Sequence, residues 1–455
     1  MNGKWINGSG KWFLSIVITV LFSAQFSAAQ NDGSEQNAMG RAGTFAIVNA
    51  RIVTVAGEVI PSGTIVMQNG KITAVGANAA VPSGAERIEG RGMIVFPGMI
   101  DAGTNLGLAE IPQGVNASVD ISEVGAMNAN AKAIKGIHPH SSHVNVTRVN
   151  GITTVMSAPT GGSIPGQSAI INLNGSTTDE MAVIKEFGLV INFPRVVAGG
   201  FGGGFGGAGP SQPTEFSELI RRRDTAVDEL KKLFRNAESY LRARDAYTRD
   251  RNLSYVPADQ RYEGMAPYIR GERPVIFTVE RERDIKAVAK FVGDMKLKGI
   301  IVGGQEAWKA ADDLKKNNIS VVYTNIYSLP ARDDDPYDYL FEAPAKMQAA
   351  GIKYCISTGD GGAEVRDLPY HAGLAGGFGL SREDALKSVT LYPAQILGIA
   401  DQMGSLEVGK MANVVVADGD ILDPRTNIKY MFIAGRMIPL TSRHTRLFDS
   451  FKDRK

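Results

Sequence analysis

Histidine is the first residue type to consider, because a neutral imidazole binds divalent metals and exchanges protons near neutral pH. The sequence holds five histidines: His138, His140, His143, His371 and His444. The first three lie together in HPHSSH, which is either a metal-binding cluster or a loop that enters a helix. Ser141 is a typical helix N-cap, and Pro139 keeps the residue before it extended, so the pattern favours the loop.

Charged residues that follow short apolar runs form a second group. Glu280, Arg281 and Arg283 come directly after PVIFTV, and residues 333–335 are consecutive aspartates. Adjacent acids of this kind form either a cation site or, more simply, a solvated turn. No GxSxG nucleophile motif occurs, and the single cysteine, Cys355, excludes a disulfide framework and a CxxC metal site.

Recurring apolar runs would position these side chains. Continuous runs are typical of strands covered on both faces, and several alternate with amphipathic segments such as residues 281–297. Residues 381–397 begin with SRED, which predicts a serine-capped helix. About eight strands interleaved with helices predict an α/β fold, a (β/α)8 TIM-like barrel over residues 94–398, whose mouth is formed by the loops after the strands. The alternative, a doubly wound open sheet, lacks a glycine fingerprint between a strand and a helix.

Shorter strands flank the predicted barrel on both sides. Residues 44–93 contain FAIVNARIVTV and GTIVMQNGKITAVG, in which Asn69-Gly70 predicts a two-residue hairpin turn. Strand-like segments return in residues 399–440, but they are too few for a separate domain. We therefore expect the two ends of the chain to combine into one small composite β-sandwich domain.

An insertion at residues 199–272 interrupts the predicted barrel. Residues 199–209 carry eight glycines, and a long charged helix is expected over about 214–248, with Leu230 and Phe234 in its apolar stripe. This segment is either a helix packed on the rim of the barrel or a hinged lid over its mouth.

Residues 1–29 are predicted to be a cleaved signal peptide. Lys4 and Lys11 precede an apolar stretch, and Ser27 and Ala29 suit the small positions of a cleavage site. The stretch is too short for a membrane span, so we expect a periplasmic or secreted protein with no stable span after cleavage. Loss of these two lysines from the 49 basic residues leaves 47, equal to the 47 acidic residues, which gives no support to nucleic acid binding.

Three stretches resemble the amidohydrolase superfamily: IVFPGMIDAGTNLG, ISTGD and TLYPAQILGIADQMGSLEVGKMANVVVADGD. The similarity is closest to the composite-domain branch, which includes imidazolonepropionase-like and dihydroorotase-like hydrolases, and it covers about residues 44–440. The resemblance implies a barrel joined to a composite β domain. It also implies hydrolysis of carbon–nitrogen bonds by water that one or two divalent metals, such as zinc, activate.

The resemblance further implies a set of metal ligands, and most of those positions differ in this chain. The family's first barrel strand carries His-x-His, where this sequence has Gly103 and Asn105. Two later histidine positions correspond to Thr278 and Gln305. Asp360 of ISTGD is retained, and the matching aspartate of the family is a ligand and general base. The resemblance therefore implies a degenerate site that keeps no full metal-ligand set, in which the three polar side chains would contact substrate.

Two functions remain open. The first is a hydrolase of carbon–nitrogen bonds in a small cyclic amide or dipeptide, with Asp360 as base. His371 follows eleven residues later and is a second candidate base, unless it packs beneath a loop. The alternative is a catalytically inactive pseudoenzyme that binds a small ligand or pairs with an active homologue, and a homo-oligomer is also open.

Overall fold

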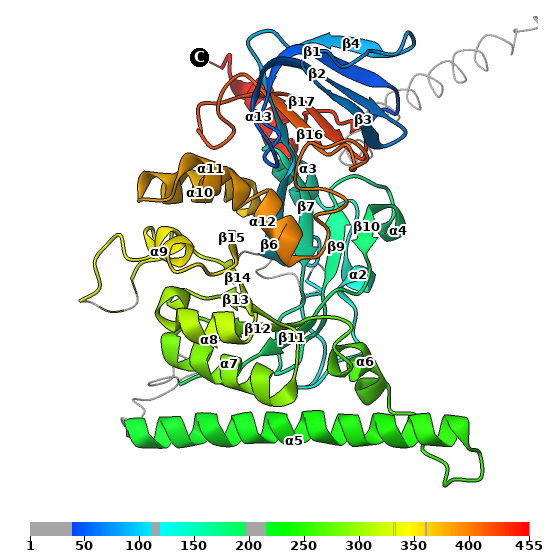
Figure 1. Ribbon diagram of the computed structural model, residues 1–455, viewed down its shortest axis with the longest axis vertical. Helices are drawn as coiled ribbons and strands as arrows, with labels where there is room; N and C mark the ends of the chain where they lie inside the picture. The colour runs from blue at the N-terminus through cyan, green and yellow to red at the C-terminus, as the bar shows by residue number, and fades with distance from the viewer. Residues whose placement is uncertain are drawn as a thin grey trace, which may run out of the picture.

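The computed structural model describes residues 39–110, 119–196, 215–330, 332, 334–359 and 362–454. The predicted signal peptide, the glycine-rich run 199–209, Asp333 and Asp360 lie outside these described residues. Within them, a sheet built from both ends of the chain sits beside a barrel of strands surrounded by helices (Figure 1). No helix in the described ranges combines the length and the apolar character needed to cross a bilayer.

Both ends of the chain contribute to one eight-stranded sheet. Its order is β18-β17-β16-β5-β1-β2-β3, and β4 pairs with β1. The strands are β1 (Phe45–Ile52), β2 (Ile60–Gln68), β3 (Lys71–Gly76), β4 (Glu86–Glu89), β5 (Ile94–Pro97), β16 (Val414–Ala417), β17 (Ile428–Ile433) and β18 (Arg436–Met437). The two ends join where β16 lies antiparallel to β5. Phe45, Ile65 and Phe432 belong to an apolar cluster separate from that of the barrel. Both chain ends thus share one sheet, and the sandwich form of the expected composite domain stays a prediction.

The turn between β2 and β3 confirms the predicted hairpin. Gln68 pairs with Lys71 across the turn, and Asn69 and Gly70 have φ values of 51° and 79°. Both central residues of a type I′ turn need positive φ, which asparagine and glycine adopt more readily than other residues.

The barrel strands form two further sheets, in the orders β15-β14-β13-β12-β11-β8 and β10-β9-β7-β6. They are β6 (Met99–Thr104), β7 (Ile152–Ser157), β8 (Gly166–Gln167), β9 (Ala169–Asn172), β10 (Ala182–Ile184), β11 (Leu189–Asn192), β12 (Val275–Val279), β13 (Gly299–Gly303), β14 (Ser320–Tyr323) and β15 (Tyr354–Ile356). Strands β11 to β15 are parallel, as are β6 and β7. Ile100, Ile276, Val322 and Cys355, from four of these strands, share one buried apolar cluster.

Three strand pairs depart from the expected parallel order. β8 runs antiparallel to β11, and β10 runs antiparallel to β9. β9 also runs antiparallel to β7, with Thr154 opposite Asn172. No helix lies between these two strands, whereas a parallel pair needs a crossover connection, usually helical. A run buried on both faces has the same composition in either direction, so the apolar pattern did not reveal the reversal.

The helices outside the insertion include those that the sequence predicts within residues 281–297 and 381–397. They are α2 (Ala133–Gly136), α3 (Ser142–Arg148), α4 (Thr178–Met181), α7 (Glu282–Met295), α8 (Ala311–Lys316), α9 (Ala343–Ala349), α10 (Leu368–Gly377), α11 (Arg382–Lys387), α12 (Leu391–Ile396) and α13 (Arg443–Phe451), with short 3-10 turns at Ala307–Ala310 and Val365–Asp367. Ser381 caps α11 by accepting a hydrogen bond from the N–H of Asp384 at 3.0 Å, as SRED predicts. The single helix expected over 381–397 is divided into α11 and α12.

The insertion forms a 34-residue helix, α5 (Phe216–Arg249), followed by α6 (Gln260–Ile269). α5 runs along the outside of the barrel below α7 and α8 in the view of Figure 1. Phe234 of α5 packs edge-on against Phe291 of α7, with ring centres 5.5 Å apart. An ion pair at 3.1 Å joins Arg223 to Asp284, and both side chains are largely buried. These contacts fix α5 to the flank of the barrel.

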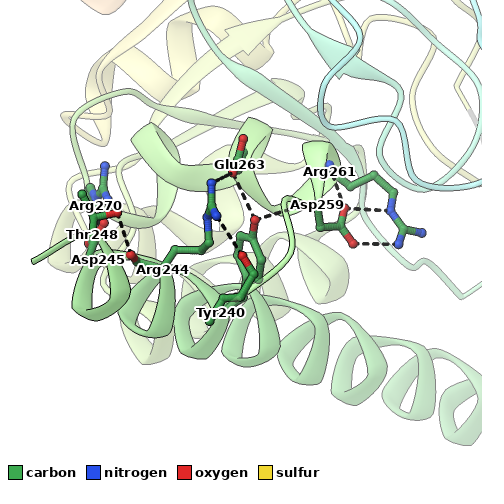
Figure 2. A network of polar contacts seen from close by, with 9 residues as sticks. Tyr240, Arg244, Asp245, Thr248, Asp259, Arg261, Glu263 and Arg270 are labelled. Carbon is green, nitrogen blue, oxygen red and sulfur yellow. Dashed lines mark hydrogen bonds and ion pairs between the residues drawn. The ribbon is translucent and has the colours of Figure 1, made fainter. Parts of the chain in front are cut away.

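A polar network holds α5 to α6 (Figure 2). Tyr240 and Arg244 of α5 both donate to one carboxylate oxygen of Glu263, at 3.1 and 3.2 Å. Arg270, just after α6, pairs with Asp245 of α5 at 3.0 Å. α5 is therefore held by contacts to α7 and by contacts to α6, which agrees with a helix packed on the barrel. The predicted hinge lies outside the described residues.

Candidate functional site

The end of β12 marks an open part of the barrel mouth. Side chains alternate along a strand, so Thr278 and Glu280 follow Ile276 of the interior cluster on the same face. Thr278 is exposed although the other four residues of β12 are buried. Solvent therefore reaches the inner face of the strand at its carboxyl end, where barrel enzymes carry their sites.

Glu280 is the mouth residue with the clearest capacity for proton transfer. Its Oε2 accepts a hydrogen bond from the backbone N–H of Gln305 at 3.4 Å. Burial raises the pKa of Glu280 to about 7, although that N–H and the charges of Arg281 and Arg195 favour the ionised form. A carboxyl group with a pKa near the working pH can both donate and accept a proton.

Glu306, which follows β13, is a buried carboxylate whose pKa is shifted down, in contrast to that of Glu280. Its side chain accepts hydrogen bonds from the N–H of Glu282 at 2.9 Å, from Tyr339 Oη at 3.2 Å and from Lys309 Nζ at 3.3 Å. Arg332 lies 3.3 Å from the same carboxylate. Burial acts to raise the pKa of Glu306, but the Glu282 N–H and the charge of Lys309 outweigh it and leave the pKa below its usual value.

Asp101 links the two barrel sheets where β6 lies beside β15. β6 and β15 are end strands of the two barrel sheets, and no backbone ladder links them in the described ranges. The Asp101 carboxylate accepts hydrogen bonds from the Ser357 hydroxyl, from Thr358 Oγ1 at 2.6 Å and from the Gly103 N–H at 3.2 Å. Burial raises the pKa of Asp101 despite these donors. Its role is therefore to close the barrel wall between β6 and β15.

The residues at the family's His-x-His positions do not suit a histidine-bound metal. A Cβ atom added to Gly103 would lie 2.9 Å from Ser357 Oγ and 3.1 Å from Val322 Cγ1, so the interior leaves no room for an imidazole. Asn105 presents a buried Oδ1 that has no hydrogen-bond partner. In the described part of the chain, no group of three or more histidines, cysteines or acids is placed to hold a metal ion. A catalytic zinc needs about three such ligands, and Gly103 and Asn105 supply neither an imidazole nor a carboxylate.

The predicted site residues are only partly brought together. Gln305 contacts Glu280 through its backbone N–H, and Thr278 lies on β12, which ends directly before Glu280. Within the described ranges, no hydrogen bond joins Asn105, Thr278 and Gln305 to one another, and Asp360 is not described. His371 is 5% exposed in α10, and its ring meets that of Tyr327 edge-on at 4.5 Å. Their roles in binding or catalysis stay predictions.

The HPHSSH segment is a loop that leads into a helix, as its pattern favours. Ser141 caps α3 by accepting a hydrogen bond from the His143 N–H at 3.2 Å, and His140 precedes the helix. His143 Nε2 lies 2.9 Å from the carbonyl oxygen of Glu110. His138 Nδ1 accepts a hydrogen bond from the His140 backbone N–H at 3.3 Å. Among the described residues, these histidines form no group of three or more ligands that could hold a metal ion.

A cavity of about 470 Å³ lies on the rim between α5 and α7. Phe216 of α5 and Glu306 both line it, and the Arg283 guanidinium lies over the Phe216 ring, 4.6 Å from its centre. A larger cavity of about 1110 Å³ lies at the opposite, amino-terminal end of the barrel strands, next to Pro274 and Tyr354. The insertion thus reaches the rim of the mouth.

Asp101 and Glu306 were not recognised from the sequence. Asp101 lies inside an apolar run, and a charged residue there is stable only with buried hydrogen-bond partners. Its position in the run is the sequence signal that could have revealed it. Glu306 follows a strand that ends in Gly-Gly, so the rule applied to Glu280 would also have found it.

Comparison with known proteins finds a partial family match and a shared fold. Residues 342–438 match the amidohydrolase family. An amidohydrolase structure from Thermotoga maritima aligns with 88% of this chain and 100% of its own, at 22% identity and a TM-score of 0.75. The chain thus resembles the amidohydrolase family in sequence over residues 342–438. The structural likeness shows the amidohydrolase fold, which agrees with the predicted barrel.

Other similar proteins align with a lower TM-score or match over less of the chain. An imidazolonepropionase from Syntrophobacter fumaroxidans is 40% identical over 81 residues, which are 17% of this chain and 19% of that protein. The match thus spans about a fifth of that relative's length. A prolidase structure complexed with N-methylphosphonate-L-proline aligns with 87% of this chain and 99% of its own, at 15% identity and a TM-score of 0.52. Phenylurea hydrolase B aligns with 88% and 97%, at 16% identity and a TM-score of 0.53. These likenesses show the fold.

Proposed function

We propose that this protein hydrolyses a carbon–nitrogen bond in a small cyclic amide or dipeptide at the barrel mouth. The family match over residues 342–438 supports this reaction class. The observation that carries the proposal is Glu280, whose pKa of about 7 belongs to a carboxyl group beside the solvent-open Thr278. An acid in this position can transfer a proton at neutral pH.

The proposed reaction divides the proton transfers between two carboxyl groups. The Asp360 carboxylate would accept a proton from the attacking water, and the water oxygen would bond to the carbonyl carbon. Glu280 in its acid form would give a proton to the nitrogen as the carbon–nitrogen bond breaks. Asn105 and Thr278 would bind polar atoms of the substrate, and Gln305 holds Glu280 through its backbone N–H.

We propose that the metal-ligand set of the superfamily is degenerate in this chain. The closed space at Gly103 and the donors available in the described residues support this, so none of the steps above uses a metal. Elemental analysis of the purified protein should find less than one equivalent of zinc. Full occupancy by zinc, lost together with activity, would contradict the degenerate set.

A panel of dipeptides and cyclic amides tests the hydrolase. Turnover should fall at least a hundredfold in E280Q, which keeps the shape of the side chain and cannot donate the acid proton. E282Q is the matched control, because the Glu282 carboxylate stands two residues further along, at the start of α7, where it pairs with Lys286. Equal loss in both variants would refute the role of Glu280.

A second function is favoured by the same closed interior at Gly103. Without a strong Lewis acid the mouth could bind small amides without turnover, which would make this chain a pseudoenzyme that pairs with an active homologue. Amides that raise the melting temperature of the protein, with no product detected by mass spectrometry, would decide for this second function. We also propose that residues 1–29 direct export and that the mature chain acts in the periplasm or outside the cell.

A further inference from the structure

Helix α13 carries an unusual concentration of exposed apolar side chains. None of its nine residues is buried. Leu447, Phe448 and Phe451 are 47%, 68% and 50% exposed. Residues three and four apart share one face of a helix, so these three side chains form a continuous apolar strip. Scattered exposed apolar residues are normal, whereas a strip of this kind indicates a binding surface.

The ends of this strip are positively charged. Residues 443–454 contain four cations and two carboxylates. Arg443 stands before the strip, and Lys452 and Arg454 follow it. Partial desolvation, followed by the charges of Arg366 and Arg443, lowers the pKa of His444 in the first turn of the helix.

The fold holds this helix in place against the body of the protein. Ser442 and Thr445 form a reciprocal capping box, with hydrogen bonds of 2.8 and 3.3 Å. Arg366 Nη1 lies 3.0 Å from His444 Nδ1, which ties the first turn to the 3-10 turn before α10. α13 lies close to α3, beside the composite sheet (Figure 1). Its apolar strip is therefore presented on a formed helix.

We propose that α13 is a membrane-surface helix that binds the headgroup region of a bilayer rich in anionic phospholipid. A helix with large aromatic residues on one face and cations beside them lies in the interface plane of such a bilayer, where the apolar residues enter the acyl boundary and the cations meet the phosphates. The cations favour an anionic lipid surface over an apolar protein partner, since they gain no matching charge from a purely apolar groove. This attachment is independent of the reaction proposed for the barrel mouth.

Vesicle sedimentation of the full chain tests this attachment. The protein should sediment with vesicles that contain about 30% phosphatidylglycerol and stay in solution with pure phosphatidylcholine, and about 0.5 M salt should release it. The double variant F448S/F451S should bind at least tenfold more weakly. R443Q and K452Q should each lower binding roughly fivefold.

L253S is the matched control, because Leu253 is 49% exposed in the loop between α5 and α6. It should bind as the parent protein does, and all variants should keep the parent melting temperature. Absence of sedimentation with anionic vesicles would overturn the proposal, as would equal loss in L253S. A dimer in sedimentation equilibrium that F448S/F451S abolishes, without vesicle binding, would assign the strip to a second copy of this chain and would also overturn it.

Discussion

Replacement of Glu280 by glutamine should change how the stability of the protein depends on pH. The folded-state pKa of about 7 lies above the ordinary value of 4.5, so the folded protein holds this proton more tightly than the unfolded chain. Stability from this group is fully present below pH 4.5 and is lost as pH rises through 7. With one pKa unit equal to about 1.36 kcal/mol, the loss between pH 5 and pH 8 is about 2.5 kcal/mol.

The E280Q variant lacks this ionisation and should not show the loss. Urea unfolding of both proteins at pH 5, 6, 7 and 8 gives the free energy of unfolding of E280Q minus that of the parent at each pH. The difference should grow in favour of E280Q by about 2.5 kcal/mol over this range. A difference that stays constant within about 0.5 kcal/mol would refute the argument that burial dominates the Glu280 site.

E306Q is the matched control with the opposite sign. The pKa of Glu306 is lowered, so its carboxylate stabilises the fold above the unfolded-state pKa and this stability is lost as pH falls. Replacement by glutamine leaves Lys309 and Arg332 without their buried anion. The variant should be less stable than the parent at pH 7 by about 2–3 kcal/mol. A gain in stability would mean that the cations do not offset burial of the charge.

D101A removes the acceptor that bridges β6 and β15, and it should lower the free energy of unfolding by about 3 kcal/mol because buried donors lose their partner. A loss below about 1 kcal/mol in urea titration would contradict this bridge. G103A should cost about 1–3 kcal/mol through overpacking, whereas G377A, where a Cβ meets nothing within 4 Å, should be neutral or slightly stabilising. Equal effects of the two glycine variants on melting temperature would show that the interior has room. F234A should lower the free energy of unfolding by about 3–4 kcal/mol and speed proteolysis within α5, because Phe234 packs on Phe291. Unchanged proteolysis would mean that other contacts hold the helix.

Local patterns predicted the elements that depend on neighbouring residues alone. The Asn69-Gly70 turn and the serine caps at Ser141 and Ser381 occur as expected, because each is set by a few adjacent residues. α7 follows the amphipathic stripe of residues 281–297 closely. The direction of β9 was not predictable in this way, because pairing direction depends on the connection between strands.

The candidate site was less predictable, because its properties come from contacts distant in sequence. Glu280 could be placed at a strand end, but its raised pKa depends on how the surrounding barrel buries it. The lack of space at Gly103 comes from Val322, which lies on β14, and from Ser357, which directly follows β15. Asp101 likewise gains its role only where β6 meets the end of β15, more than 250 residues away. Contacts of this kind are invisible to periodicity and motif.

The sheet made from both chain ends has a consequence during synthesis. About 320 residues separate Pro97 of β5 from Val414 of β16, so β5 emerges from the ribosome long before the strand that covers its edge. At 5–20 residues per second this interval is about 16–63 seconds. Through that time the nascent chain presents an unpaired, apolar strand edge, the kind of surface that chaperones bind and that aggregation exploits. The pairing of β16 with β5, which completes the sheet, is therefore a late event in the synthesis and folding of this protein.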